Sequence, residues 1–465
     1  MMKTCLRAAC AALALFLLSS CGGGGGGGGV PIAGLGGSSA GVASGPTGTP
    51  AGDQSAQQSL LDRNAAPAGG GSGPGDTGSG PGSGSAGGGS SNGGGTSVAG
   101  GDDGSGVGSG GTGVSTADAG IGSVDGAGSI LVNGVHYNTD GAVVVLDDVP
   151  GLQLGMTAKV TGPFDTDLTS GSAQRVESAI DLRGPAGSVN VGQGNFVILG
   201  TTVTTDEATV WADARGAADI AAGATLQVWG LPSAPGSLRA TRVEVHASGT
   251  PILSGVVQNL DAVARRFSIG STTIDYAQAT VTGGAAGLPF ANGVLVRVRA
   301  NAIGTGPLVA SSVQWWYPAP AADGVALQLA GVVTDLNGLA SLRVLGRRVN
   351  ASAAKVSGGP ERSVGNGVKV IVGGVMSGGV LQANRLKVQN VPGTGGQPSF
   401  SLTGQISTFN SIADFRIKGQ PIDASGPKVV FVNGSAANLG AHVRVSVEGS
   451  RVADGVLIAD RVTYQ

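Results

Sequence analysis

The chain has 465 residues, and 88 of them are glycine, far above the usual share of about 7%. Aromatic residues make up only 4%, so we expect small cores built from Val, Ile, Leu and Ala. A formal net charge of −2 argues against nucleic-acid binding, which depends on clustered Lys and Arg. The three cysteines, Cys5, Cys10 and Cys21, leave the rest of the chain without a disulfide, a cysteine nucleophile or a thiolate metal ligand.

Residues 1–20 have the pattern of a signal peptide. A basic start precedes an apolar core, Ala8–Leu18, about half as long as a bilayer span. Leu18-Ser19-Ser20-Cys21 then resembles the bacterial lipobox, which implies cleavage before Cys21 and acyl chains, palmitate among them, on its thiol and new amine. Two or more chains anchor a protein stably to a membrane. The alternative is an ordinary secretory signal, which would leave the protein without a lipid.

Residues 21–118 are expected to form a disordered tether. The segment consists mainly of Gly, Ser, Ala, Thr and Pro, and such a composition buries too little apolar surface to offset its ordering entropy. A glycine-rich coil of this length spans roughly 50–60 Å. Position 22 is Gly and not Asp, which in the Gram-negative sorting pattern that the lipobox resembles favours the outer membrane. We therefore expect a lipid-anchored protein of the outer membrane.

From residue 119 onward, Val, Ile and Leu alternate with polar residues, and turn signals recur every few residues, as in short β-strands. A predicted hairpin appears five times, with apolar residues at its start, at +2 and at +7. A two-residue turn at +3 and +4 pairs the start with +7 on one face, which we expect to be the core face. The sets are Ile130/Val132/Tyr137, Phe196/Ile198/Val203, Phe267/Ile269/Ile274, Leu342/Val344/Val349 and Phe415/Ile417/Ile422.

The hairpins belong to a longer repeat. Each is followed by a turn glycine that leads into a strand, and then by a closing strand that begins at an alanine. The glycines are Gly155, Gly223, Gly293, Gly367 and Gly440, and the alanines are Ala173, Ala240, Ala310, Ala383 and Ala459. The predicted repeats are residues 119–184, 185–250, 251–325, 326–398 and 399–465.

These features predict an all-β protein of five tandem small β-barrel domains, because closure removes exposed sheet edges. The alternative is a continuous β-solenoid. The pattern over residues 119–465 resembles domain-of-unknown-function family 5666, which is found in tandem in exported proteobacterial proteins. The resemblance implies an OB-like barrel and assigns no catalytic residues.

The chain has three histidines, a residue type that often serves in catalysis and in metal binding. His136, His246 and His442 fall at non-equivalent positions, and we expect each on the outer face of a strand. In particular, His246 is expected to share an outward face with Arg242 and Glu244. No catalytic site, metal site or cofactor is predicted from these residues.

Other charged pairs also carry no predicted site. We interpret Asp165/Asp167 and Asp206/Glu207 as solvated turns, because no full oxygen-ligand loop surrounds either pair. Arg265-Arg266 and Arg347-Arg348 are two isolated basic pairs in or beside hairpins, and they form no nucleic-acid track. The alternative for such a pair is a functional anion site.

The most distinctive local feature is Trp315-Trp316-Tyr317, followed by Pro318. Adjacent side chains of a strand face opposite ways, so one Trp should be exposed unless a neighbouring repeat covers it. We expect the run to pack against the fourth repeat. The leading functional hypothesis is a non-enzymatic cell-envelope lipoprotein that presents its repeats to an envelope polysaccharide or protein in structural or adhesive contacts. The alternative is carbohydrate binding by Trp315, Trp316 and Tyr317.

Overall fold

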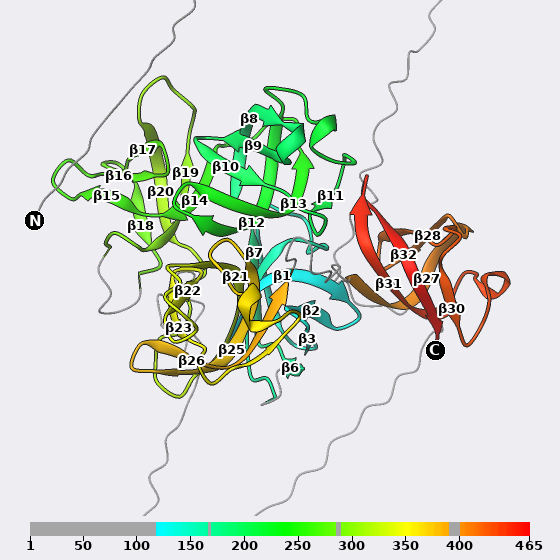
Figure 1. The fold of residues 1–465 in the computed structure, drawn as a ribbon. Helices are drawn as coiled ribbons and strands as arrows, with labels where there is room; N and C mark the ends of the chain where they lie inside the picture. The colour runs from blue at the N-terminus through cyan, green and yellow to red at the C-terminus, as the bar shows by residue number, and fades with distance from the viewer. Residues whose placement is uncertain (1–117, 166–168, 285–289, 390–399) are drawn as a thin grey trace, which may run out of the picture. The chain divides into compact units, whose positions relative to one another are not determined.

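The computed structural model describes residues 118–165, 169–284, 290–389 and 400–465 (Figure 1). The predicted signal peptide, Cys21 and all but the last residue of the predicted tether lie outside them. The described residues are all-β, with four short 3-10 helices: η2 (Val191–Gln193), η3 (Ala217–Asp219), η4 (Glu361–Ser363) and η5 (Ala436–Asn438). Within these ranges, the chain has no helix that is long and apolar enough to cross a membrane.

Five successive stretches of chain, named stretch one to stretch five, contain the strands. Stretch one contains β1 (Ala119–Ala127), β2 (Ile130–Val132), β3 (Val135–Asn138), β4 (Val143–Asp147), β5 (Thr157–Thr161), β6 (Ser170–Ser172) and β7 (Arg175–Ala179). Stretch two contains β8 (Leu182–Asn190), β9 (Asn195–Ile198), β10 (Thr201–Thr204), β11 (Val210–Trp211), β12 (Thr225–Ala234) and β13 (Ser237–Val245).

Stretch three contains β14 (Ile252–Val256), β15 (Gln258–Asp261), β16 (Arg266–Ile269), β17 (Thr272–Asp275), β18 (Thr280–Thr282), β19 (Leu295–Ala300) and β20 (Leu308–Trp315). Stretch four contains β21 (Ala326–Thr334), β22 (Leu342–Val344), β23 (Arg347–Asn350), β24 (Lys355–Ser357), β25 (Lys369–Ser377) and β26 (Val380–Gln389). Stretch five contains β27 (Phe400–Ser411), β28 (Asp414–Ile417), β29 (Gln420–Asp423), β30 (Val430–Val432), β31 (Arg444–Ala453) and β32 (Val456–Tyr464).

The hairpins form as predicted. In each, the starting residue is the direct partner of the residue at +7, for example Ile130 with Tyr137 and Phe415 with Ile422. The same pairing occurs in the other three, and all ten side chains are buried. Asn133 and Gly134 occupy the turn with φ values of 57° and 80°, as a type I′ turn requires. The alternation of the sequence therefore fixes both register and inner face.

Stretch two illustrates how the strands within a stretch pair. β8 pairs antiparallel with β9, and β9 pairs antiparallel with β10. β10 and β11 then run parallel to the closing strand β13. β12 lies antiparallel between β13 and β8, so that the hydrogen bonds return to the first strand.

The prediction of five discrete β-barrel domains was wrong, because strands also pair across the stretches. β1 runs parallel to β21 through Ala119–Ile121 and parallel to β27 through Gly126 and Ala127. β14 pairs antiparallel with β8. All the strands named above consequently belong to two sheets, one of 19 strands and one of 13. Sheets that continue from stretch to stretch are what the alternative, a continuous β-solenoid, predicts.

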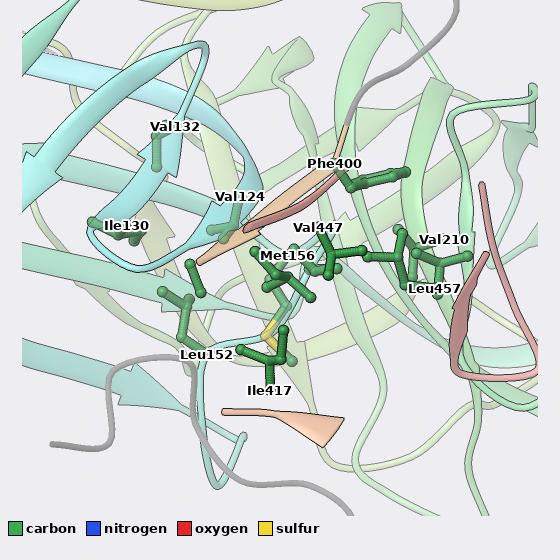
Figure 2. Close-up of a cluster of buried hydrophobic side chains, with 14 of the residues drawn as sticks. Val124, Ile130, Val132, Leu152, Met156, Val210, Phe400, Ile417, Val447 and Leu457 are labelled. Carbon is green, nitrogen blue, oxygen red and sulfur yellow. The ribbon is translucent and has the colours of Figure 1, made fainter. Parts of the chain in front are cut away.

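The hydrophobic cores show why the stretches are not independent. One buried cluster joins side chains of stretches one and five and also takes in Val210 of β11. Figure 2 shows Met156 of stretch one close to Ile417 and Val447 of stretch five. A segment of about 65 residues buries too little surface to be more than marginally stable alone. Shared cores and covered strand edges supply the remaining burial.

A glycine recurs at a β-bulge in stretches two, four and five. Gly230, Gly374 and Gly449 each lie where the register shifts between the last two long strands of a stretch. A Cβ atom on Gly374 would lie 2.0 Å from the carbonyl oxygen of Gln382. Stretch three has Ala300 at this position, so the backbone there accommodates a methyl group. The glycines therefore allow the two strands to approach closely at the bulge.

Candidate functional site

The aromatic run is buried where several stretches meet. Trp315 ends β20 opposite Val296 of β19, and the backbone N–H of Trp316 donates to the carbonyl of Leu295 at 3.0 Å. Trp315 is 8% exposed and Trp316 is 7% exposed. Neither Trp is exposed, because neighbouring parts of the chain cover both side chains.

Three side chains hold Trp316 through polar, aromatic and cation–π contacts. Its indole Nε1–H donates to Oδ1 of Asp181, which directly precedes β8. The ring of Tyr317 stacks on the Trp316 ring with centroids 4.2 Å apart and 27° between the planes. The Arg297 guanidinium lies 5.0 Å from the Trp316 ring centre, within the range of a cation–π contact. These contacts fix the indole and leave little of it accessible.

Asp181 is a buried carboxylate, only 2% exposed. Besides Trp316, its donors are the hydroxyl of Thr157 at 2.7 Å and the backbone N–H of Gly230 at 2.9 Å. Burial raises the pKa of Asp181 to about 6, although these hydrogen bonds and the charge of Arg297 act to lower it. Asp181 thus joins stretches one, two and three through one side chain.

Arg297, on β19, is 1% exposed and carries charge into the same region. It donates to the carbonyl of Ile180 at 2.7 Å, to Asp147 at 2.9 Å and to Asp148 at 2.8 Å. Arg299 contacts the same two carboxylates. Burial raises the pKa of Asp148, but hydrogen bonds from Arg299 and Arg297 outweigh it and hold the pKa below its usual value.

Tyr317 extends the contacts to stretch one. Its hydroxyl donates to the carbonyl of Thr157 at 3.0 Å and accepts from the backbone N–H of Ala179 at 3.4 Å. The φ angle of Tyr317 is 42°, which is uncommon for a residue with a side chain. The side-chain contacts hold the backbone in this conformation. We call Asp181, Arg297, Trp316 and Tyr317 the buried polar node.

A cavity of about 320 Å³ lies beside the node. Its wall is mostly apolar and includes Trp315, Leu231 of β12, Leu329 of β21 and Leu345 of the hairpin turn in stretch four. Asp181 and Arg347 are the charged residues of the wall. Residues from four stretches therefore enclose one space.

Comparison with known proteins identifies part of the chain. The model of the family described as "Domain of unknown function (DUF5666)" matches residues 183–244, 254–314 and 403–463. The chain carries three DUF5666 repeats. The match corrects the prediction of five repeats from residue 119 to 465, since stretches one and four are not matched. No curated protein matched the chain.

The buried polar node lies at the edges of the matched DUF5666 repeats. Asp181 comes just before the first matched segment, and Trp316 and Tyr317 come just after the second, whereas Arg297 lies within the second. The node therefore joins DUF5666 repeats to one another and to stretch one. The contacts of the node therefore belong to the packing between repeats.

The three histidines are exposed, as predicted, but only His136 lies in a strand, β3, whereas His246 follows β13 and His442 precedes β31. The predicted face of β13 was wrong, however, because Arg242 and Glu244 are buried while Val245 is exposed. Arg242 donates to Glu244 at 2.6 Å and to the carbonyl of Leu154 at 2.9 Å. A loop of stretch one covers this face, and the sequence of β13 alone gives no sign of it.

Of the remaining charged candidates, Arg347 lines the cavity beside the node. Asp206 accepts from Arg239 at 2.9 Å, and Arg266 donates to Asp275 at 3.1 Å. Asp167 lies outside the described residues. In the described part of the chain, no group of three or more His, Cys, Asp or Glu residues is arranged to hold a metal ion.

Sequence reasoning missed Asp181 and Arg297, although each had a signal. Asp181 stands between Ile180 and Leu182, and Arg297 stands between Val296 and Val298. A single charge within an apolar run indicates a paired buried residue, because charged side chains are seldom fully buried unless paired.

Proposed function

We propose that the protein is a non-enzymatic cell-envelope lipoprotein that is anchored through Cys21 and presents a continuous β array for structural or adhesive binding. The observation that carries the proposal is that sheets, cores and the buried polar node join the stretches. Such an array places its surfaces at fixed spacing, and repeated weak contacts then act together. The lipobox-like Leu18–Cys21 and the glycine-rich segment after it support an anchor with a flexible exit.

The anchor is tested with the full chain and a matched Cys21→Ala variant in a Gram-negative host. The native chain should incorporate labelled palmitate and sediment with outer membranes, whereas the variant should do neither. Equal labelling of both chains would contradict lipidation at Cys21. Protease treatment of intact cells, followed by an antibody against residues 400–465, then shows which side of the membrane the array faces.

Binding is tested with the purified chain immobilised at its N-terminal end. The probes are peptidoglycan, lipopolysaccharide and matrix proteins, each offered to the native chain and to a heat-unfolded control. The proposal predicts weak binding to at least one probe that increases with the surface density of the chain. Absence of binding to every probe at high density would contradict an adhesive role.

The burial of Trp315 and Trp316 argues against the alternative, which is carbohydrate binding by Trp315, Trp316 and Tyr317. Trp315 and Trp316 are 8% and 7% exposed as whole residues, which leaves little ring surface on which a polysaccharide can stack. Trp315→Ala combined with Trp316→Ala is therefore expected to impair folding more than polysaccharide binding. Selective loss of polysaccharide binding with an unchanged unfolding transition would instead favour the carbohydrate proposal.

A further inference from the structure

The cavity beside the buried polar node has the character of a small-molecule site. Its volume of about 320 Å³ lies at the lower end of the range for ligand pockets, roughly 300–1,000 Å³. Trp315, Trp316, Tyr317, Leu231 and Leu329 give it an aromatic and aliphatic wall. A wall of this kind favours the apolar body of a ligand, and the size limits that body to a short chain or a single ring.

Arg347 gives the cavity an unmatched positive charge. Its guanidinium is half-buried and makes one hydrogen bond, from Nη2 to the carbonyl of Ala319 at 2.8 Å. Within the described residues, no carboxylate forms an ion pair with Arg347. Other arginines of the node region are paired, as Arg297 is with Asp147 and Asp148. A partly buried charge without a partner is costly, and an anion that enters the cavity would relieve that cost.

We propose that the cavity binds a small amphipathic monoanion, a carboxylate with a short aliphatic or aromatic body. The carboxylate would accept hydrogen bonds from the free N–H groups of Arg347, and the apolar body would lie against Trp315 and Leu329. Arg suits this role because its planar fork matches a carboxylate with two parallel hydrogen bonds. This site does not depend on the proposed cellular location or on any adhesive function.

Two features of the cavity wall restrict the charge of the ligand. Gly346 and Gly293 line the cavity and are themselves exposed, so the opening lies beside Arg347 on the hairpin of stretch four. Asp181 lines the same cavity with its oxygens already accepting from three donors. A ligand with a second carboxylate would bring that charge into a space that already contains an anion. The site should therefore prefer monoanions to dianions.

The test uses three ligands of equal chain length with the full exported chain. Octanoate, 1-octanol and octanedioate are titrated by isothermal calorimetry into the native chain, Arg347→Met and Arg348→Met. Methionine keeps the apolar stem and removes the charge, and Arg348 is the adjacent exposed arginine. We expect the native chain to bind one octanoate and to bind octanedioate more weakly.

Arg347→Met should weaken octanoate binding by about tenfold or more, the effect of losing a charge-assisted hydrogen bond. The same variant should leave 1-octanol binding within about twofold of the native value. Arg348→Met should change neither. Absence of octanoate binding to the native chain, or equal effects of the two arginine variants, would overturn the proposal.

A second variant tests the cavity without removing the charge. Ala321 lies in the loop before β21, is only partly buried and lines the cavity. Ala321→Trp should fill the space and abolish binding of both octanoate and 1-octanol, while the thermal unfolding of the chain stays close to native. Native octanoate affinity in this variant would place the ligand elsewhere and overturn the proposal.

Discussion

Replacing Arg297 with methionine should separate the stretches that the buried polar node joins. The variant loses three hydrogen bonds, to Ile180, Asp147 and Asp148, and the cation–π contact with Trp316. A hydrogen bond to a charged group contributes about 1.5–3 kcal/mol. Asp147 and Asp148 are 48% and 21% exposed and keep Arg299, so water and that arginine recover part of the loss. We therefore expect a net destabilisation of about 3 kcal/mol.

The matched control is Arg299→Met, which touches the same two carboxylates from a position that is 25% exposed. This variant should lower the free energy of unfolding by about 1 kcal/mol or less. Urea unfolding followed by tryptophan fluorescence gives the stability of each variant, and hydrogen exchange shows where protection is lost. Arg297→Met should lose protection on β8, β19 and β20. The reasoning is refuted if Arg299→Met is the more destabilising of the two, or if loss of protection in Arg297→Met is confined to β19.

Two further predictions concern Asp181 and the bulge glycines. Because the pKa of Asp181 is about 6 in the folded chain and the ordinary value is 3.8, the unfolded chain releases this proton first, and stability should fall by about 3 kcal/mol as pH rises from about 4 to about 6. Asp181→Asn should remove this decline from urea-unfolding curves measured across that range, and an unchanged slope would contradict the assignment. Gly374→Ala should lower the free energy of unfolding by about 1–3 kcal/mol, because the new Cβ would meet the carbonyl of Gln382. Gly440 has open space around it, so Gly440→Ala should have a free energy of unfolding within about 0.5 kcal/mol of the native value in the same assay. Equal effects of the two glycine substitutions would count against steric crowding at the bulge.

Local features were predictable from sequence because they depend on neighbours in the chain. The pairing of Phe196 with Val203 and the turn at Asn133-Gly134 follow from alternation and from turn preferences. The partners across stretches were not predictable in this way. An apolar residue such as Ile121 indicates burial, but not that β21 is the strand beside it.

The candidate site was only partly visible from sequence for the same reason. The run Trp315–Tyr317 stood out by composition, and the structure places it beside Asp181, more than a hundred residues earlier in the chain. The sequence marks Arg347 only as one half of an isolated basic pair, and the folded chain shows that Arg347 lines an apolar cavity while Arg348 is exposed. Patterns of period two assign faces to residues but do not say what covers each face.

The pairing of β1 with β21 and β27 has a consequence for how the chain is made. Ala119–Ile121 are synthesised about two hundred residues before their partners Leu327–Leu329. At translation rates of about 5–20 residues per second, that strand edge waits on the order of 10–40 s for its partner. An unpaired edge in this interval is a template for association with other chains. A product that stops before β21 would leave that edge of β1 permanently open, so the later stretches act as a cover for the first.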